Sequence, residues 1–279
     1  MSAALPEGGW RARLELAYER RDGRTIPSLR RHEGPLRVQK HFEPEAAWCE
    51  HVIVHPPAGI AGGDRLEVEL TIGEGANARL TTPGATRWYR SAGAEATSSL
   101  VARVGAGAAL EWLPQEQIVF DGAIGQSAAR FELAPDATLI AWDVVTLGRR
   151  AGARPFEHGR FGSRLEVVRG GELVFSDRML LDADDALRSS VIGWAGADTL
   201  TTMIATGPAL GAVASWLSAS RALEGRAGVS ALPSTPPLIV LRLLGDDTAA
   251  AHAWLRAQWA IARPNVIGRA PCAPRIWST

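Results

Sequence analysis

The segment Arg65-Leu-Glu-Val-Glu-Leu-Thr-Ile-Gly-Glu-Gly-Ala-Asn-Ala-Arg-Leu-Thr-Thr82 decides the fold class of this chain. Apolar and polar residues alternate through 65–72, and the alternation resumes after the turn residues Gly73-Glu-Gly75. A period of two is the spacing of a β-strand that buries one face, and glycine suits a tight turn. The segment therefore predicts two strands joined at a short turn.

The same strand–turn–strand pattern returns at 100–113, 129–142 and 164–175, each time around glycine or Pro-Asp. A spacing of roughly 30 residues lies within the range of stacked repeat folds. A meander that closes into a sandwich would give similar strand pairs, but the near-constant spacing favours strands wound helically into a stack. We therefore predict a mainly β protein whose stacked, wound β-sheet body (β-helix-like) occupies about residues 30–190.

The C-terminal third has a different pattern. Apolar residues recur every three or four positions across 208–223, which predicts an amphipathic α-helix. After an apolar strand, Asp246-Asp247 supply the cap of a second helix, which we expect to stop before Pro264. We expect the two α-helices to pack on one side of the β body, as a mixed α/β part at about 191–279 of a single domain spanning 1–279.

The composition limits the kinds of partner. Thirty basic and thirty acidic residues give no formal net charge, so we do not expect nucleic-acid binding. Near-zero charge also weakens repulsion between molecules, which is typical of a subunit that a partner covers. No signal segment precedes Trp10, and no apolar run approaches the roughly 20 residues of a membrane helix. We therefore expect a cytoplasmic protein with no membrane segment.

The loop His55-Pro-Pro-Ala-Gly-Ile-Ala-Gly-Gly-Asp64 lies between two apolar, strand-like runs. Its prolines fix φ and remove N–H donors, whereas its glycines permit positive φ or the close approach of another segment. The backbone is thus specified more tightly than an ordinary turn requires. Such a shaped loop suggests a contact surface.

Together with Thr81-Thr-Pro-Gly-Ala-Thr-Arg-Trp-Tyr-Arg-Ser91, this loop resembles the urease accessory protein D family (UreD, also called UreH). The resemblance recurs in order along the chain, at Arg31–Gln39, Leu110–Glu116, the Leu147-Gly-Arg segment and Arg263–Thr279. Two positions depart from the family pattern: Ala58 stands where another glycine is usual, and Asp143 where we expect a glutamate.

The resemblance implies a β-helix-like fold with two helices and a function in urease maturation. It implies a non-enzymatic scaffold that binds apo-urease and, through a UreF-like partner, recruits a UreG-like GTPase for nickel insertion. Nickel would pass in transit, with no tightly bound cofactor. The residues that we expect along such a route are the carboxylates Asp64, Glu116, Asp143 and Asp177, with His55 as a further donor.

The residues themselves are compatible with weak nickel handling. Carboxylate and imidazole groups suit Ni²⁺, but the chain has no C-x-x-C pair. Its one H-x-x-x-H spacing, His51 to His55, lies at the end of a strand-like run and not on a helix, so it does not form the chelating pair of a closed metal site. For each of these residues the structural alternative stays open. In particular, Asp64 and Arg65 could simply pair with neighbours and cap the loop.

Two segments are candidates for partner contact. Arg87, Trp88, Tyr89 and Arg90 follow a Pro-Gly turn and combine rings with cations, as interface anchors do. The proline-stiffened tail carries Arg275 and Trp277; we expect it to pack on the β body, with docking to a partner as the alternative.

Enzymatic activity is not expected, since the chain has no G-x-S-x-G elbow, no phosphate-binding G-x-x-x-x-G-K-[ST] loop and no G-x-G-x-x-G unit between strand and helix. A rival hypothesis is a β-helical carbohydrate-active enzyme or glycan-binding protein, in which tryptophans stack on sugars and two carboxylates act as acid and base. Most such proteins are secreted, so the missing signal segment counts against it. We expect most of the ten tryptophans to fill the core.

Overall fold

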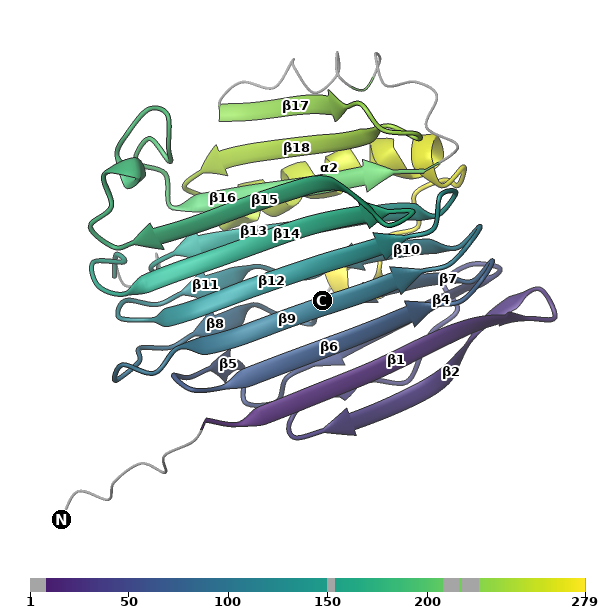
Figure 1. Ribbon diagram of the computed structural model, residues 1–279, viewed down its shortest axis with the longest axis horizontal. Coiled ribbons are helices and arrows are strands. Elements are labelled where there is room, and N and C mark those ends of the chain that lie inside the picture. The colour runs from purple at the N-terminus through teal and green to yellow at the C-terminus, as the bar shows by residue number, and fades with distance from the viewer. Residues whose placement is uncertain (1–8, 150–153, 208–215, 217–225, 279) are drawn as a thin grey trace.

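The computed structural model describes residues 9–149, 154–207, 216 and 226–278, and these are mainly β. Figure 1 shows two layers of long strands, and we call them the front sheet and the back sheet after their positions in that view. The front sheet contains, in spatial order, β15 (Glu172–Asp182), β14 (Arg160–Arg169), β12 (Ile124–Leu133), β9 (Ala96–Val104), β6 (Arg65–Ile72), β1 (Arg11–Arg21) and β2 (Arg24–Glu33).

The back sheet contains β17 (Arg226–Leu232), β18 (Leu238–Gly245), β16 (Thr199–Thr206), β13 (Thr138–Leu147), β10 (Ala109–Leu113), β7 (Asn77–Thr81), β4 (Trp48–Val54) and β3 (Arg37–Val38). The short strands β5 (Gly59–Ile60), β8 (Thr86–Trp88) and β11 (Gln117–Val119) extend it, because they pair in parallel with one another and with the end of β13. Two short 3₁₀ helices, η1 (Ala186–Arg188) and η2 (Arg275–Ser278), are also present.

The chain winds between the two sheets as a β-solenoid of about four turns. After β6 it crosses to β7, after β9 to β10 and after β12 to β13, and the strands of successive turns pair in parallel. Asn77, Ala109 and Thr138 therefore occupy one register position in successive turns. The predicted repeat of roughly 30 residues and the wound β architecture are confirmed.

The predicted turns have two different geometries. The turn at Gly73-Glu-Gly75 is a corner at which the chain leaves one sheet for the other, as are the corners near 105–107 and 134–136. Only the fourth turn, at Arg169-Gly-Gly171, closes a true antiparallel hairpin, between β14 and β15. From there to β18 the strands pair antiparallel, so the solenoid ends at this point.

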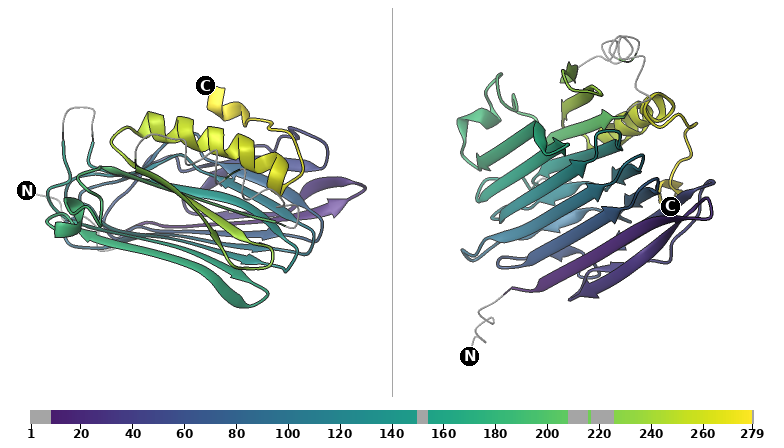
Figure 2. Two further views of the ribbon diagram at one scale, coloured as in Figure 1. Left: turned by 90° about the horizontal axis from the view of Figure 1, so that it is seen from above. Right: turned by 45° about the vertical axis from the view of Figure 1, so that its right-hand side comes forward.

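One long helix, α2 (Thr248–Val266), is present among the described residues. Asp247 caps it as predicted, because its carboxylate accepts hydrogen bonds from the N–H groups of Ala249 and Ala250. The helix does not stop before Pro264 but continues to Val266, which corrects that expectation. Pro264 lies in the last turn, where proline removes only one backbone hydrogen bond and leaves the preceding turns of the helix intact. Figure 2 shows α2 lying along one side of the sheet layers.

The other expected helix, at 208–223, lies outside the described residues except for Trp216, so the expectation of two long helices is met by one in the part that the structure describes. Trp216 is buried, and its indole N–H donates to Gln258 Oε1 of α2 at 3.1 Å. None of the described helices is long and apolar enough to cross a membrane.

Two cores hold these layers together. The first lies between the sheets, and the second lies between the back sheet and α2, where Trp142, Leu241, Trp254 and Trp259 meet. Most of the tryptophans are buried in one or the other, which confirms that they mainly fill the core.

A buried ionic cluster fixes α2 and the tail on the back sheet. Glu111 accepts hydrogen bonds from Arg79 Nε at 2.7 Å, Arg263 Nε at 3.0 Å and the Trp259 indole at 2.7 Å. Arg79 also donates to the carbonyl oxygen of Cys272 at 2.8 Å. Because Arg79, Glu111 and Arg263 are fully buried, each charge depends on the others for its stability.

Candidate functional site

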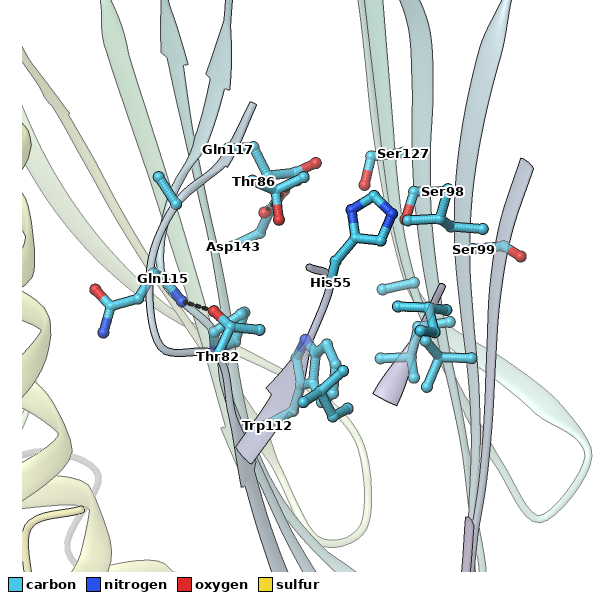
Figure 3. A pocket seen from close by; sticks show the side chains of 18 of the residues that line it. His55, Thr82, Thr86, Ser98, Ser99, Trp112, Gln115, Gln117, Ser127 and Asp143 are labelled. Atoms are coloured by element: carbon cyan, nitrogen blue, oxygen red, sulfur yellow. Dashed lines mark hydrogen bonds between the residues drawn. The ribbon is translucent and has the colours of Figure 1, made fainter. Parts of the chain in front are cut away.

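A cavity of about 340 Å³ lies between the two sheets. In Figure 3 the His55 ring stands in this space, with Asp143, Gln117 and Thr86 on one side and Ser98 and Ser127 on the other. Its polar lining includes hydroxyl, amide, imidazole and carboxylate groups, and two arginines also line it: His55, Thr82, Thr86, Ser98, Ser99, Gln115, Gln117, Ser127 and Asp143, with Arg87 and Arg164. The two sheets thus leave a partly open space whose lining mixes polar and apolar side chains.

Short side chains on the front sheet create this space. Ser98 of β9 pairs in register with Leu66 of β6 and with Ser127 of β12, and Ser127 pairs with Ser163 of β14. Serine in a row that would otherwise carry large apolar side chains leaves volume unfilled and presents hydroxyl groups. Apolar residues such as Leu100 and Leu165 close the cavity in the next row.

Asp143 is the carboxylate that faces the cavity. Its neighbour Trp142 packs in the core beneath α2, so alternation along β13 directs Asp143 toward the front sheet. Its Oδ1 accepts a hydrogen bond from Gln117 Nε2 at 2.7 Å, while Gln117 Oε1 accepts one from the Trp88 indole at 3.2 Å. Burial, and to a lesser degree the charge of Asp177, raises the pKa of Asp143.

His55 is the imidazole in the same cavity. It follows β4 at the start of the shaped loop and is partly buried. Burial lowers its pKa, although the charge of Asp64 opposes the shift. The ring is therefore neutral near pH 7 and can offer a nitrogen lone pair to a metal ion.

Asp64 has the structural role that was left open for it. Its two carboxylate oxygens accept hydrogen bonds from the backbone N–H groups of Trp10 at 2.7 Å and Ala61 at 2.8 Å, so it ties the start of the chain to the loop. It is not among the residues that line the cavity.

Glu116 is likewise engaged elsewhere, since its Oε2 lies 2.9 Å from His252 Nε2 of α2. Burial acts to raise its pKa, but the hydrogen bonds from His252 and from its own backbone amide more than offset this, so the pKa lies below its ordinary value. Asp177 forms an ion pair with Arg242 at 2.6 Å. The structure thus places two of the five expected residues, His55 and Asp143, in one cavity, with Asp177 near Asp143 and the other two apart.

No group of three or more His, Cys, Asp or Glu side chains within the described ranges could hold a metal ion. A cation in the cavity would therefore find Asp143, His55 and several hydroxyl and amide oxygens without a closed ligand set. Such an arrangement favours weak, exchangeable binding.

The two motif loops contact each other. β5 pairs with β8, and the N–H of Tyr89 donates to the carbonyl oxygen of Ile60 at 2.8 Å. A Cβ on Gly59 would lie 2.1 Å from the Tyr89 ring, so this glycine is needed for the close approach. Ala58, the departure from the family pattern, has a φ of 60°, a conformation that glycine adopts more readily.

The expected partner-contact residues divide into buried and exposed groups. Trp88 is only 1% exposed and packs edge-to-face on Phe161, so its place in the core does not fit a surface role. Arg87, Tyr89 and Arg90 are exposed, and Arg90 pairs with Asp121 at 2.5 Å.

The tail packs on the protein itself. Trp277 stacks on Trp142 with ring centroids 5.6 Å apart and meets the edge of Trp259 at 5.1 Å, which confirms the favoured interpretation. Arg275 beside it is exposed.

Sequence reasoning missed several residues of interest. Gln117 and Arg242 hold the carboxylates of Asp143 and Asp177, but no local pattern marks them. Val191 and Ile192 are 88% and 87% exposed in the turn after η1, and two adjacent apolar residues directly after Ser189-Ser190 were a signal that could have found them.

The wound β body, with a cavity between its two sheets that holds one buried carboxylate, defines the class of protein as a β-solenoid. A sequence model of the UreD urease accessory protein family matches residues 11–278. The chain is 46% identical to urease accessory protein UreD 2 of Pseudomonas syringae pv. syringae, over 100% of this chain and 98% of that protein. It is 45% identical to urease accessory protein UreD of Nitrosococcus oceani, over 97% and 90% of the two chains.

The same identity, 45%, relates it to urease accessory protein UreD of Pseudomonas aeruginosa PAO1 over the full length of both chains. The chain therefore belongs to the UreD urease accessory protein family. It is a non-enzymatic accessory factor in urease maturation. The rival hypothesis of a carbohydrate-active enzyme or glycan-binding protein is set aside.

Proposed function

We propose that this protein is a cytoplasmic scaffold that binds apo-urease and recruits UreF-like and UreG-like partners, and that nickel passes through its inter-sheet cavity on the way to the urease active site. The observation that carries the proposal is Asp143. It is a carboxylate in a serine-lined cavity, and no arginine, lysine or histidine among the described residues forms an ion pair with it.

Electrostatics favour a passing cation at this position. Burial disfavours the charged form of Asp143, so its pKa is raised, and a divalent cation that enters the cavity stabilises the carboxylate. Hydroxyl groups of Ser98, Ser127 and Thr86 can replace part of the ion's water shell. His55 adds a neutral nitrogen donor of the kind that nickel accepts.

Weak binding suits transit. With one carboxylate and one imidazole in the cavity, the ion keeps several water ligands and leaves readily. Nickel is therefore a cargo of this protein and not a resident cofactor.

For the partner surfaces we propose the exposed members of the predicted set. Arg87 both lines the cavity and is exposed, so it lies where the interior meets the surface. Tyr89 and Arg90 follow directly after β8, the strand that pairs with the shaped loop, and Arg275 marks a separate surface at the tail. Asp64 and Glu116 support the route indirectly, by fixing the loop and by joining the sheet to α2.

Asp143→Asn tests the proposal, because it removes the charge and keeps the shape of the side chain. In cells that express urease with its accessory proteins, the variant should still co-purify with the apo-urease complex but lower the nickel content of urease several-fold. Asp136→Asn, at an exposed turn, is the matched control. Normal nickel content with Asp143→Asn would overturn the proposed route.

The proposed partner surface is tested separately with an Arg87→Glu, Arg90→Glu double variant, by measuring how much of the apo-urease complex co-purifies with it. This variant should weaken the complex without changing the fold, as judged by its circular dichroism spectrum. An intact complex would remove this surface from the proposal.

A further inference from the structure

One ion pair bridges the two sheets near the cavity. Arg242 lies on β18 of the back sheet and Asp177 on β15 of the front sheet, and their side chains meet at 2.6 Å. The Arg242 side chain is 47% exposed and that of Asp177 is 26% exposed. The pair therefore stands at the edge of the inter-sheet space, where one partner can move toward solvent.

Arg242 and Asp143 project from the same face of the back sheet. Both pair in register with Thr202 of β16, which lies between them. Their neighbours Leu241 and Trp142 pack beneath α2, so alternation directs Arg242 and Asp143 toward the front sheet. Two strand spacings separate their backbones by about 10 Å, which is within reach of a long arginine side chain and an intervening ion.

Asp177 approaches the cavity from the opposite side. It pairs in register with Leu165 of β14, and Leu165 lines the cavity that Asp143 faces. The negative charge of Asp177 is also felt at Asp143, where it opposes ionisation. Two carboxylates thus flank one end of the cavity, and only Asp177 has a counter-cation.

We propose that Arg242 is a tethered competitor of the passing cation, which must displace the guanidinium from Asp177 before it can bind both carboxylates. This inference rests on the proposed function and concerns the regulation of the same route. A divalent ion that is bound by Asp143 and Asp177 together would be held more tightly than by either alone. Arg242 returns to Asp177 as the ion leaves, so the ion is not trapped.

The chemistry of arginine suits this role. The guanidinium stays charged at every physiological pH and makes directed hydrogen bonds to a carboxylate. Its long apolar stem lets the charged end move into water while the backbone stays in the sheet. Partly exposed ion pairs are weak, so a hydrated divalent ion can compete with this one.

Ni²⁺ binding to the purified full-length chain tests the inference, measured by equilibrium dialysis against a chromophoric chelator. Arg242→Gln should raise the affinity for Ni²⁺ by up to about fivefold, the range expected for release of a partly exposed ion pair. The increase should vanish in the Arg242→Gln, Asp177→Asn double variant. An unchanged affinity in Arg242→Gln, or an increase that persists in the double variant, would overturn the inference.

Asp177→Asn alone gives a second measurement if Arg242→Gln does not fold. It removes a ligand and leaves the Arg242 charge unpaired, so Ni²⁺ affinity should fall below that of the wild-type chain. An affinity equal to wild type would count against the competition.

These outcomes are separable from those of the proposed function. If Arg242→Gln binds Ni²⁺ more tightly while Asp143→Asn leaves the nickel content of urease unchanged, Arg242 does compete with the cation, but nickel does not reach urease through this cavity. If Asp143→Asn lowers the nickel content but Arg242→Gln leaves Ni²⁺ affinity unchanged, the route stands and the competition is wrong.

Discussion

Asp64 offers the sharpest separation of a structural role from a role in nickel transfer. Both of its carboxylate oxygens accept backbone hydrogen bonds, from Trp10 at 2.7 Å and from Ala61 at 2.8 Å, and the residue is buried. Hydrogen bonds to a charged group contribute about 1.5–3 kcal/mol each. Since water reaches the released Trp10 amide, we expect Asp64→Ala to lower the free energy of unfolding by about 2–4 kcal/mol.

Asp64→Asn is the graded comparison. The amide keeps one acceptor oxygen and loses the charge, so one of the two hydrogen bonds should survive in weaker form. We expect a loss of about 1–2 kcal/mol. The assay is urea unfolding followed by tryptophan fluorescence, with Asp184→Ala at an exposed turn as the control for removal of a charge alone.

The refuting result is clear in this case. If Asp64→Ala unfolds at the wild-type urea concentration and yet lowers the nickel content of urease, Asp64 acts in the route and does not serve as a cap of the loop. If stability falls as expected, any defect in nickel transfer by this variant is explained by a loosened loop.

Three further predictions concern the core, acid sensitivity and the tail. Glu111→Gln should lower the free energy of unfolding by about 2–3 kcal/mol, because Arg79 and Arg263 lose the fully buried carboxylate that they share and keep only Glu50 and Glu45 as counter-charges; a urea midpoint near wild type would contradict this. Burial, with the nearby His41 and Arg30, lowers the pKa of His51 to about 4, below its value of about 6.5 in an unfolded chain, so the unfolded state binds a proton first as the pH falls. Stability should therefore fall by roughly 3 kcal/mol between about pH 6.5 and pH 4, and His51→Phe should remove this component of the slope, whereas parallel pH profiles would show that His51 does not contribute. Trp277→Ala should lower stability by about 1–2 kcal/mol and speed proteolysis of the tail, since its stacking on Trp142 is lost; an unchanged cleavage rate would show that the ionic cluster alone holds the tail.

The repeat and the C-terminal helix follow from local rules. Strands recur in the sequence at nearly constant spacing because each solenoid turn uses a similar length of chain, and Asp247 marks the start of α2 because a carboxylate satisfies free N–H groups there. The packing of Trp277 could also be predicted from the sequence, because a proline-stiffened tail with apolar side chains is expected to bury them against the β body.

The sequence alone did not distinguish the corners of the solenoid from hairpin turns, because in both cases turn residues join two strands of alternating apolar and polar residues. At Gly73-Glu-Gly75 the chain changes sheets, whereas at Gly170-Gly171 it folds back within one sheet. The difference depends on which strands lie alongside each segment, and that is set by contacts remote in the sequence.

The cavity and its carboxylates depend on the same remote contacts. Ser98 and Ser127 form a polar row only because their strands pair in register. Asp177 and Arg242 are far apart in sequence and meet only because β15 and β18 lie at the same end of the two sheets and face each other across the inter-sheet space. Similarly, nothing local distinguishes Asp64, which caps a loop, from Asp143, which faces the cavity.

The most direct test of the central claim is to fill the cavity and measure the nickel bound per urease active site. Ser127→Phe places a ring in the cavity, whereas Gln126→Phe adds the same ring at the next position, on the exposed face of β12. The account predicts that urease matured with Ser127→Phe contains several-fold less nickel while the accessory complex still co-purifies, and that Gln126→Phe has no effect. Full nickel loading with a folded Ser127→Phe variant would contradict passage through this protein.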